Sequence, residues 1–90
     1  DTEEEKMLSD EVWSELNYTL QALLSEDGQP MVKVTYFQPD VAKDGGIYKE
    51  VSGKFLGVDR FNRELSLSGG VYIYLDRISA IKKVEKSIDL

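Results

Sequence analysis

Five consecutive residues, Asp59-Arg60-Phe61-Asn62-Arg63, form the densest group of side chains able to bind a ligand. Arginines bind phosphates, and an exposed aromatic ring can stack on a base of single-stranded nucleic acid. Arg77 would join this group if the two turns lie at one end of the fold. The alternative is an ordinary turn, in which Asp59 and Asn62 bond local backbone groups and Phe61 folds back onto the core.

The remaining polar residues give little support for catalysis. The 90 residues include no histidine and no cysteine, which removes the usual general base, the thiol nucleophile and the commonest transition-metal ligands. A serine nucleophile would need a lysine or a carboxylate as its base, and no pattern indicates such a pair. Asp40, Asp44 and Asp59 lack the ordered spacing of a calcium loop. We expect no enzyme activity, no cofactor and no metal site.

Three aromatic residues are candidate anchors for a protein partner: Trp13, Tyr72 and Tyr74. Trp13 lies on the apolar stripe of an expected helix, which either packs on the rest of the fold or docks a partner. The two tyrosines alternate with apolar residues in an expected strand, and this alternation fits either a buried edge or an interface between subunits. A monomer and a homo-oligomer therefore both stay open.

An amphipathic helix should position Trp13. Apolar residues recur at spacings of three and four: Leu8, Val12, Trp13, Leu16, Leu20, Leu23 and Leu24. Ser9 suits the N-cap, and Gly28 with Pro30 would release the chain. We expect the helix within residues 8–27, and disorder over residues 1–7. Thr2 and Glu5 have capping-box spacing, which would allow an earlier start.

From Met31 onward the apolar period changes to two, which indicates strands. We expect strands over 31–37, about 47–58, 65–67, 71–75 and 81–84, with a short turn over 76–80. The second strand is long and contains Gly53 and Gly57, where a bend or bulge is typical. Closure would leave a short five-stranded sheet without exposed edges. We therefore predict one α+β domain over 1–90, with the N-terminal helix packed on a small, strongly bent five-stranded antiparallel β-barrel over 30–85.

Charge is unevenly distributed along the chain, whose formal net charge is −6. Residues 1–27 hold nine acidic residues and one lysine, whereas residues 28–90 hold eight acidic and ten basic residues. The acidic segment would repel a phosphate backbone placed near it, or it would shield the weakly basic remainder until a partner displaces it. No apolar run approaches the roughly 20 residues of a membrane span, so we expect a cytoplasmic protein.

The region from Val32 to Glu85 resembles the YolD-like family. The matching stretches are VTYF (34–37), DGGIYKEVSGKFLGVD (44–59), ELSL (64–67) and YIYLDRISAI (72–81), and the preceding helix matches in position. This resemblance implies a bacterial or phage protein of the DNA-damage (SOS) response, often encoded beside a lesion-bypass polymerase. It favours an adaptor or regulator of translesion synthesis, with that polymerase as the expected partner.

A broader resemblance is to Sm-like barrels. The stretch VSGKFLGVDRFNRELSL (51–67) is similar to the first Sm signature, and YIYLDRISAI stands in the place of the second. Sm-like rings bind uridine-rich RNA by stacking bases on a loop aromatic, and Phe61 falls at that position. Asn62 stands one residue earlier than the family's asparagine, and Leu75-Asp76 replaces its Arg-Gly pair. The resemblance implies a second function, single-stranded nucleic-acid binding through Arg60, Phe61, Asn62, Arg63 and Arg77.

Overall fold

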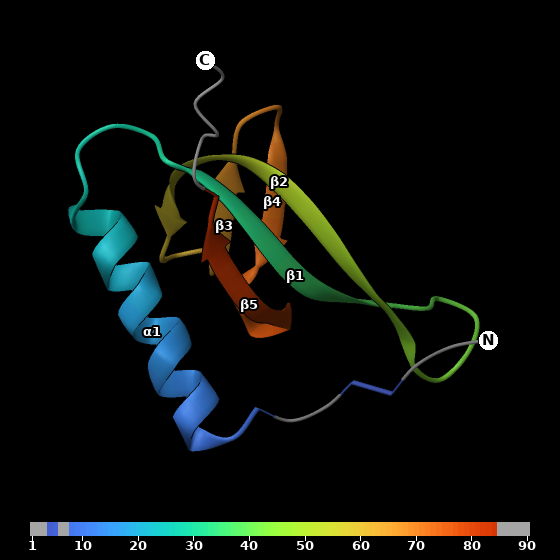
Figure 1. Ribbon diagram of the computed structural model, residues 1–90. Helices are drawn as coiled ribbons and strands as arrows, with labels where there is room; N and C mark the ends of the chain where they lie inside the picture. The colour runs from blue at the N-terminus through green and yellow to red at the C-terminus, as the bar shows by residue number, and fades with distance from the viewer. Residues whose placement is uncertain (1–3, 6–7, 85–90) are drawn as a thin grey trace, which may run out of the picture.

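The computed structural model describes residues 4–5 and 8–84 (Figure 1). Its elements follow in this order: α1 (Asp10–Ser25), β1 (Met31–Pro39), β2 (Gly46–Asp59), β3 (Glu64–Leu67), β4 (Val71–Tyr74), the 3₁₀ turn η1 (Leu75–Arg77) and β5 (Ile78–Lys83). One helix and five antiparallel strands confirm the predicted α+β class. Among the described residues, no helix is both long and apolar enough to cross a membrane.

The helix begins where the sequence predicts. The Ser9 side chain accepts a hydrogen bond from the Val12 amide at 3.3 Å, and Asp10 and Glu11 occupy the first turn, where the helix dipole favours negative charge. The predicted disorder of residues 1–7 and the capping box at Thr2 fall largely outside the described residues.

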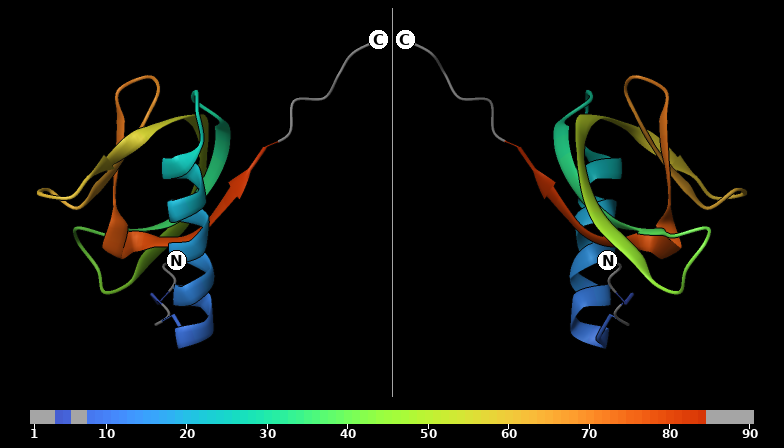
Figure 2. Two further views of the ribbon diagram at one scale, coloured as in Figure 1. Left: turned by 90° about the vertical axis from the view of Figure 1, so that its left-hand side faces the viewer. Right: turned by 90° about the vertical axis from the view of Figure 1, so that its right-hand side faces the viewer.

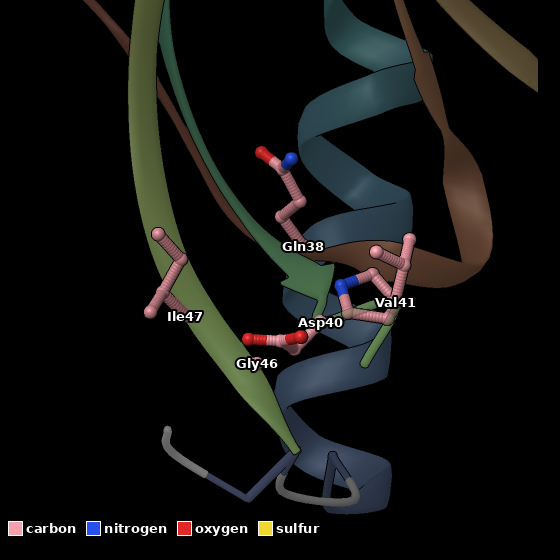
Figure 3. Close-up of a pocket in the computed structure, with 6 residues that line it drawn as sticks. Gln38, Asp40, Val41, Gly46 and Ile47 are labelled. Atoms are coloured by element: carbon pink, nitrogen blue, oxygen red, sulfur yellow. The ribbon is translucent and has the colours of Figure 1, made fainter. Parts of the chain in front are cut away.

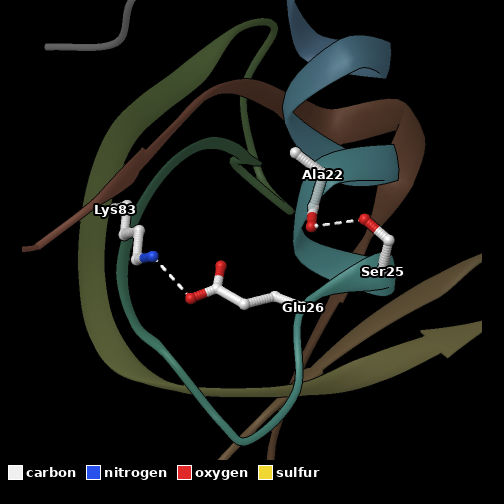
Figure 4. Close-up of polar contacts among 4 residues, drawn as sticks. All are labelled: Ala22, Ser25, Glu26 and Lys83. Atoms are coloured by element: carbon white, nitrogen blue, oxygen red, sulfur yellow. Dashed lines mark hydrogen bonds and ion pairs between the residues drawn. The ribbon is translucent and has the colours of Figure 1, made fainter.

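At the other end of α1, two side-chain contacts fix the exit of the chain (Figure 4). The Ser25 hydroxyl donates to the Ala22 carbonyl at 3.0 Å. The Glu26 carboxylate bonds the Lys83 ammonium, at the last residue of β5. The helix end is therefore tied to the sheet as well as to its own last turn.

The strands lie in the order β4-β3-β2-β1-β5. β2 pairs with β1 over Gly46–Lys54 and then with β3 from Phe55 onward, with a register shift between Phe55 and Gly57. Figure 2 shows β2 as a long, curved ribbon that joins the two halves of the sheet. A Cβ added at Gly53 would lie 3.3 Å from Leu67 Cβ, so glycine permits the close approach of β3 at the bend.

The predicted closed barrel is not present, because the described strands form an open sheet. β4 and β5 are its two edge strands and do not pair with each other. β4 is only four residues long, and η1 then turns the chain toward β1, with which β5 pairs instead. The sheet is curved, but no hydrogen bonds between β4 and β5 close it into a barrel.

The last strand also begins earlier than predicted. Residues 76–80 were expected to form a turn, but η1 ends at Arg77 and β5 starts at Ile78. The reason is pairing with β1, in which Ile78 lies opposite Tyr36 and Ile81 opposite Val34.

The core lies between α1 and the concave face of the curled sheet. Its buried members are Leu16, Leu23, Val32, Val34, Phe55, Leu65, Leu67, Ile73, Ile78 and Ile81. Leu16 and Leu23 are the buried residues of α1, which packs chiefly against β5. Burial of these side chains is the main stabilising contribution to the fold.

Candidate functional site

Asp59 holds the β2–β3 loop in one shape. One carboxylate oxygen accepts hydrogen bonds from the Phe61 and Asn62 amides at 2.9 and 3.1 Å, and the other accepts from the Asn62 side chain at 2.8 Å. The backbone bond from Asn62 is the main cause that lowers the pKa of Asp59, followed by the side-chain bond. The predicted local bonding of Asp59 and Asn62 is therefore confirmed.

Phe61 does not fold back onto the core. Its side chain is 94% exposed at the tip of the β2–β3 loop, which excludes the alternative in which it plugs the fold. Arg60 and Arg63 flank it and are also exposed. Arg63 has a φ of 54°, a left-handed conformation that turns the chain from the loop into β3. The loop thus presents an aromatic ring between two cations.

Arg77 lies beside two residues of the β2–β3 loop, Asn62 and Arg63, so the two turns do lie at one end of the fold. A hollow of about 500 Å³, which we call the loop hollow, is lined by Glu5, Asn62, Arg63, Tyr74, Asp76 and Arg77. The chain reaches this arrangement because Glu64 lies opposite Tyr74 and the Leu75 amide donates to the Arg63 carbonyl at 2.9 Å. Arg60 and Phe61 do not line the hollow. The Arg77 guanidinium is hydrogen-bonded to the Glu5 carboxylate.

A second hollow, of about 310 Å³, lies between β1 and β4, and we call it the aromatic hollow. Its lining comprises Tyr36, Phe37, Gln38, Pro39, Tyr72, Ile73, Tyr74 and Arg77. These two strands are not neighbours in the sheet, so the hollow lies where the curled sheet approaches itself. Tyr74 and Arg77 line both hollows, so the two are adjacent.

The predicted partner anchors separate into two groups. Tyr72 and Tyr74 come together at the aromatic hollow, and their side chains are 64% and 63% exposed. Trp13 is 44% exposed on α1 and lines neither hollow. Sequence reasoning missed Tyr36 and Phe37, although their place in an aromatic, β-branched strand was the one available signal.

The tip of the β1–β2 hairpin forms a third hollow, of about 270 Å³ (Figure 3). Asp40 accepts hydrogen bonds from the Ala42 and Lys43 amides at 2.8 and 3.2 Å, and Val41 is fully exposed. A Cβ at Gly46 would lie 2.1 Å from the Gln38 carbonyl oxygen, so the tight approach there requires glycine. These side chains bring no nucleophile and base together.

Metal-ligating groups do not gather in the described part of the chain. Residues 4–5 and 8–84 contain no cluster of three or more histidine, cysteine, aspartate or glutamate side chains able to hold an ion. Both carboxylate oxygens of Asp59 accept hydrogen bonds from residues of its own loop.

No protein-family model, curated protein or solved structure matches the chain. The YolD-like and Sm-like resemblances therefore stay predictions from the sequence, and the two adjacent hollows are the structural feature that bears on function.

Proposed function

We propose that this protein is a non-enzymatic binding module that docks a partner protein along β4. The observation that carries the proposal is the free edge of β4 beside the aromatic hollow. In the described residues β4 pairs with β3 alone, so its other edge leaves backbone donors and acceptors for an added strand. Tyr72 and Tyr74, both more than half exposed, would supply apolar area and hydroxyl groups to that strand.

The same geometry supports an Sm-like barrel that is incomplete in the single chain. An initial helix, a β2 strand that pairs in turn with β1 and β3, and a curled antiparallel sheet are what such a barrel requires. A strand added at β4 would extend the sheet across its open side. We infer that partner binding and completion of the barrel are one event.

The partner we propose is a lesion-bypass DNA polymerase of a bacterium or phage, with the chain acting as an adaptor or regulator in DNA-damage tolerance. Its support is the YolD-like resemblance of the strands over residues 34–81. The free edge of β4 supports the mode of docking, and the sequence resemblance supports the identity of the partner.

A pull-down with matched tyrosine variants tests this function. The full chain should retain a purified lesion-bypass polymerase. The double variant Tyr72→Ala/Tyr74→Ala should bind that polymerase at least tenfold more weakly, because aromatic anchors supply much of the binding energy of an interface. Tyr18→Ala is the control, since Tyr18 is 78% exposed on α1, away from the hollow. Equal retention by both variants, or none by the unaltered chain, contradicts the proposal.

Single-stranded nucleic-acid binding is the second candidate function, and the exposure of Phe61 favours it. A ring 94% exposed on a loop fixed by Asp59 is suited to stack on a base, with Arg60 and Arg63 beside it for phosphates. The net charge of −6 acts against this function at long range.

The test of the second function is oligonucleotide binding at low salt. A labelled thymidine or uridine oligomer should bind the chain, binding should weaken as salt rises, and Phe61→Ala should weaken it by about 1–3 kcal/mol. Tyr18→Ala again serves as the exposed-aromatic control. Binding that Phe61→Ala leaves unchanged would exclude the stacking role.

A further inference from the structure

The Glu5–Arg77 ion pair places an acidic side chain from the start of the chain inside the loop hollow. Arg77 is separated from Glu5 by most of the sequence, yet its guanidinium bonds the Glu5 carboxylate. Neither side chain is deeply buried, with exposed fractions of 39% and 36%. Arg77 also lines the aromatic hollow beside β4. A carboxylate is thus already bound at Arg77, a residue that lines both hollows.

Among the described residues, the charges that line the loop hollow are balanced only while Glu5 is present. The loop hollow is lined by two cations, Arg63 and Arg77, and by two anions, Glu5 and Asp76. Removal of Glu5 leaves two positive charges facing one negative charge. The hollow would then attract an external anionic group.

We infer that the docking edge takes an extended, apolar peptide segment carrying an acidic residue, and that Glu5 is its intramolecular competitor at Arg77. This inference rests on the proposed docking of a protein along β4. The partner's strand pairs with β4, its apolar side chains enter the aromatic hollow, and its carboxylate replaces that of Glu5. Binding and release of Glu5 are then coupled.

The surroundings of Arg77 favour a protein segment over a nucleic acid as the occupant. The aromatic hollow, which Arg77 also lines, includes Tyr36, Phe37 and Ile73, which suit aliphatic side chains. Among the described residues, Arg77 is the only charged side chain in that lining. In the loop hollow, a chain of phosphates would meet two carboxylates, Glu5 and Asp76, beside the two arginines.

The competition should be modest, because both side chains of the pair remain partly exposed to water. Exposed ion pairs correspond to about a 1.5- to 5-fold change in an equilibrium constant. Substituting Glu5 should therefore strengthen peptide binding by a few-fold, which a titration resolves.

The experiment is a nuclear magnetic resonance titration of the full chain with two probe peptides, acetyl-Ile-Val-Ile-Glu-amide and its Gln counterpart. The acidic peptide should shift the β4 amides and the Arg77 Nε signal, and it should bind Glu5→Gln about 1.5- to 5-fold more tightly. Glu4→Gln is the control, since it removes the same charge from the neighbouring residue. Arg77→Gln should bind the two peptides equally.

The outcomes separate this inference from the proposed function. If both peptides shift the β4 amides equally in every variant, docking along β4 stands and the role of Glu5 and Arg77 is wrong. If neither peptide shifts the β4 amides, both proposals fail. If Glu5→Gln strengthens binding of a thymidine oligomer but not of the acidic peptide, Arg77 serves nucleic acid and the inference is overturned.

Discussion

Asp59 determines the shape of the loop that displays Phe61. Its carboxylate accepts three hydrogen bonds from Phe61 and Asn62, two from their backbone amides and one from the Asn62 side chain. An aspartate that receives such bonds is stabilised in its ionised form. The presentation of the aromatic ring is therefore linked to the ionisation of one exposed carboxyl group.

This link predicts a dependence on pH. Because the pKa of Asp59 lies below its ordinary value of 3.8 in the folded protein, the carboxylate stabilises the fold fully above that value. The contribution is lost as the pH falls through the folded-state pKa. A carbon-detected titration of the Asp59 carboxyl group should give a midpoint below 3.8. A midpoint at or above that value would contradict the hydrogen-bonding role.

The sequence predicts the bonding of this loop but not the direction of its side chains. Asp59 and Asn62 are residue types that bond nearby backbone groups, so their pattern was readable. The exposure of Phe61 depends on the loop conformation, including the φ of 54° at Arg63, and residue type alone does not determine it. The contact of Glu5 with Arg77 likewise depends on the whole fold.

Helix α1 shows how burial separates two adjacent leucines. Leu23 is 4% exposed and belongs to the core, whereas its neighbour Leu24 is 41% exposed. Both lie in the last turns of the same helix, so substitution by alanine changes the helix propensity equally. Only the packing of the two side chains differs.

The two alanine variants should therefore differ in stability. We expect Leu23→Ala to lower the free energy of unfolding by about 2–5 kcal/mol, because it leaves a cavity against the sheet. Leu24→Ala should cost about 1 kcal/mol or less. Urea denaturation of both variants measures the difference. Similar losses would mean that α1 does not pack on the sheet through Leu23.

The helix and the five strands were predictable from local patterns, whereas the start of β5 and the closure of the sheet, which depend on distant pairing, were not. The N-cap at Ser9 and the apolar spacing of α1 lie within a few residues of one another. The start of β5 at Ile78 depends on its pairing with Tyr36, more than forty residues earlier. The missing β4–β5 pairing has the same origin, since closure depends on the path of the whole sheet.

Among the described strands, β1 is the longest that pairs with two neighbours over the same residues. It is flanked by β2 on one side and β5 on the other, and Val32 and Val34 have no exposed surface. β4 lies at an edge, and residues 40–45 form the hairpin tip. Local opening should therefore be rarest in β1.

Amide hydrogen exchange tests this order. The amides of Val32 and Val34 should exchange most slowly, at rates set by global unfolding, and those of residues 40–45 should exchange fastest among the described loops. Exchange followed by nuclear magnetic resonance gives each rate separately. Slowest exchange in α1 instead would indicate that the helix, and not the sheet, is the last element to open.

Two of the ion pairs in the described part of the chain lie at opposite ends of β5. Glu5 bonds Arg77, directly before the strand, and Glu26 bonds Lys83, its last residue. Because each glutamate pairs with a different cation, the Glu5–Arg77 pair can break while Glu26, Leu16 and Leu23 keep α1 packed on the sheet. A visiting carboxylate at Arg77 would therefore cost little internal rearrangement, and the tertiary environment of Trp13 would be the same before and after its arrival.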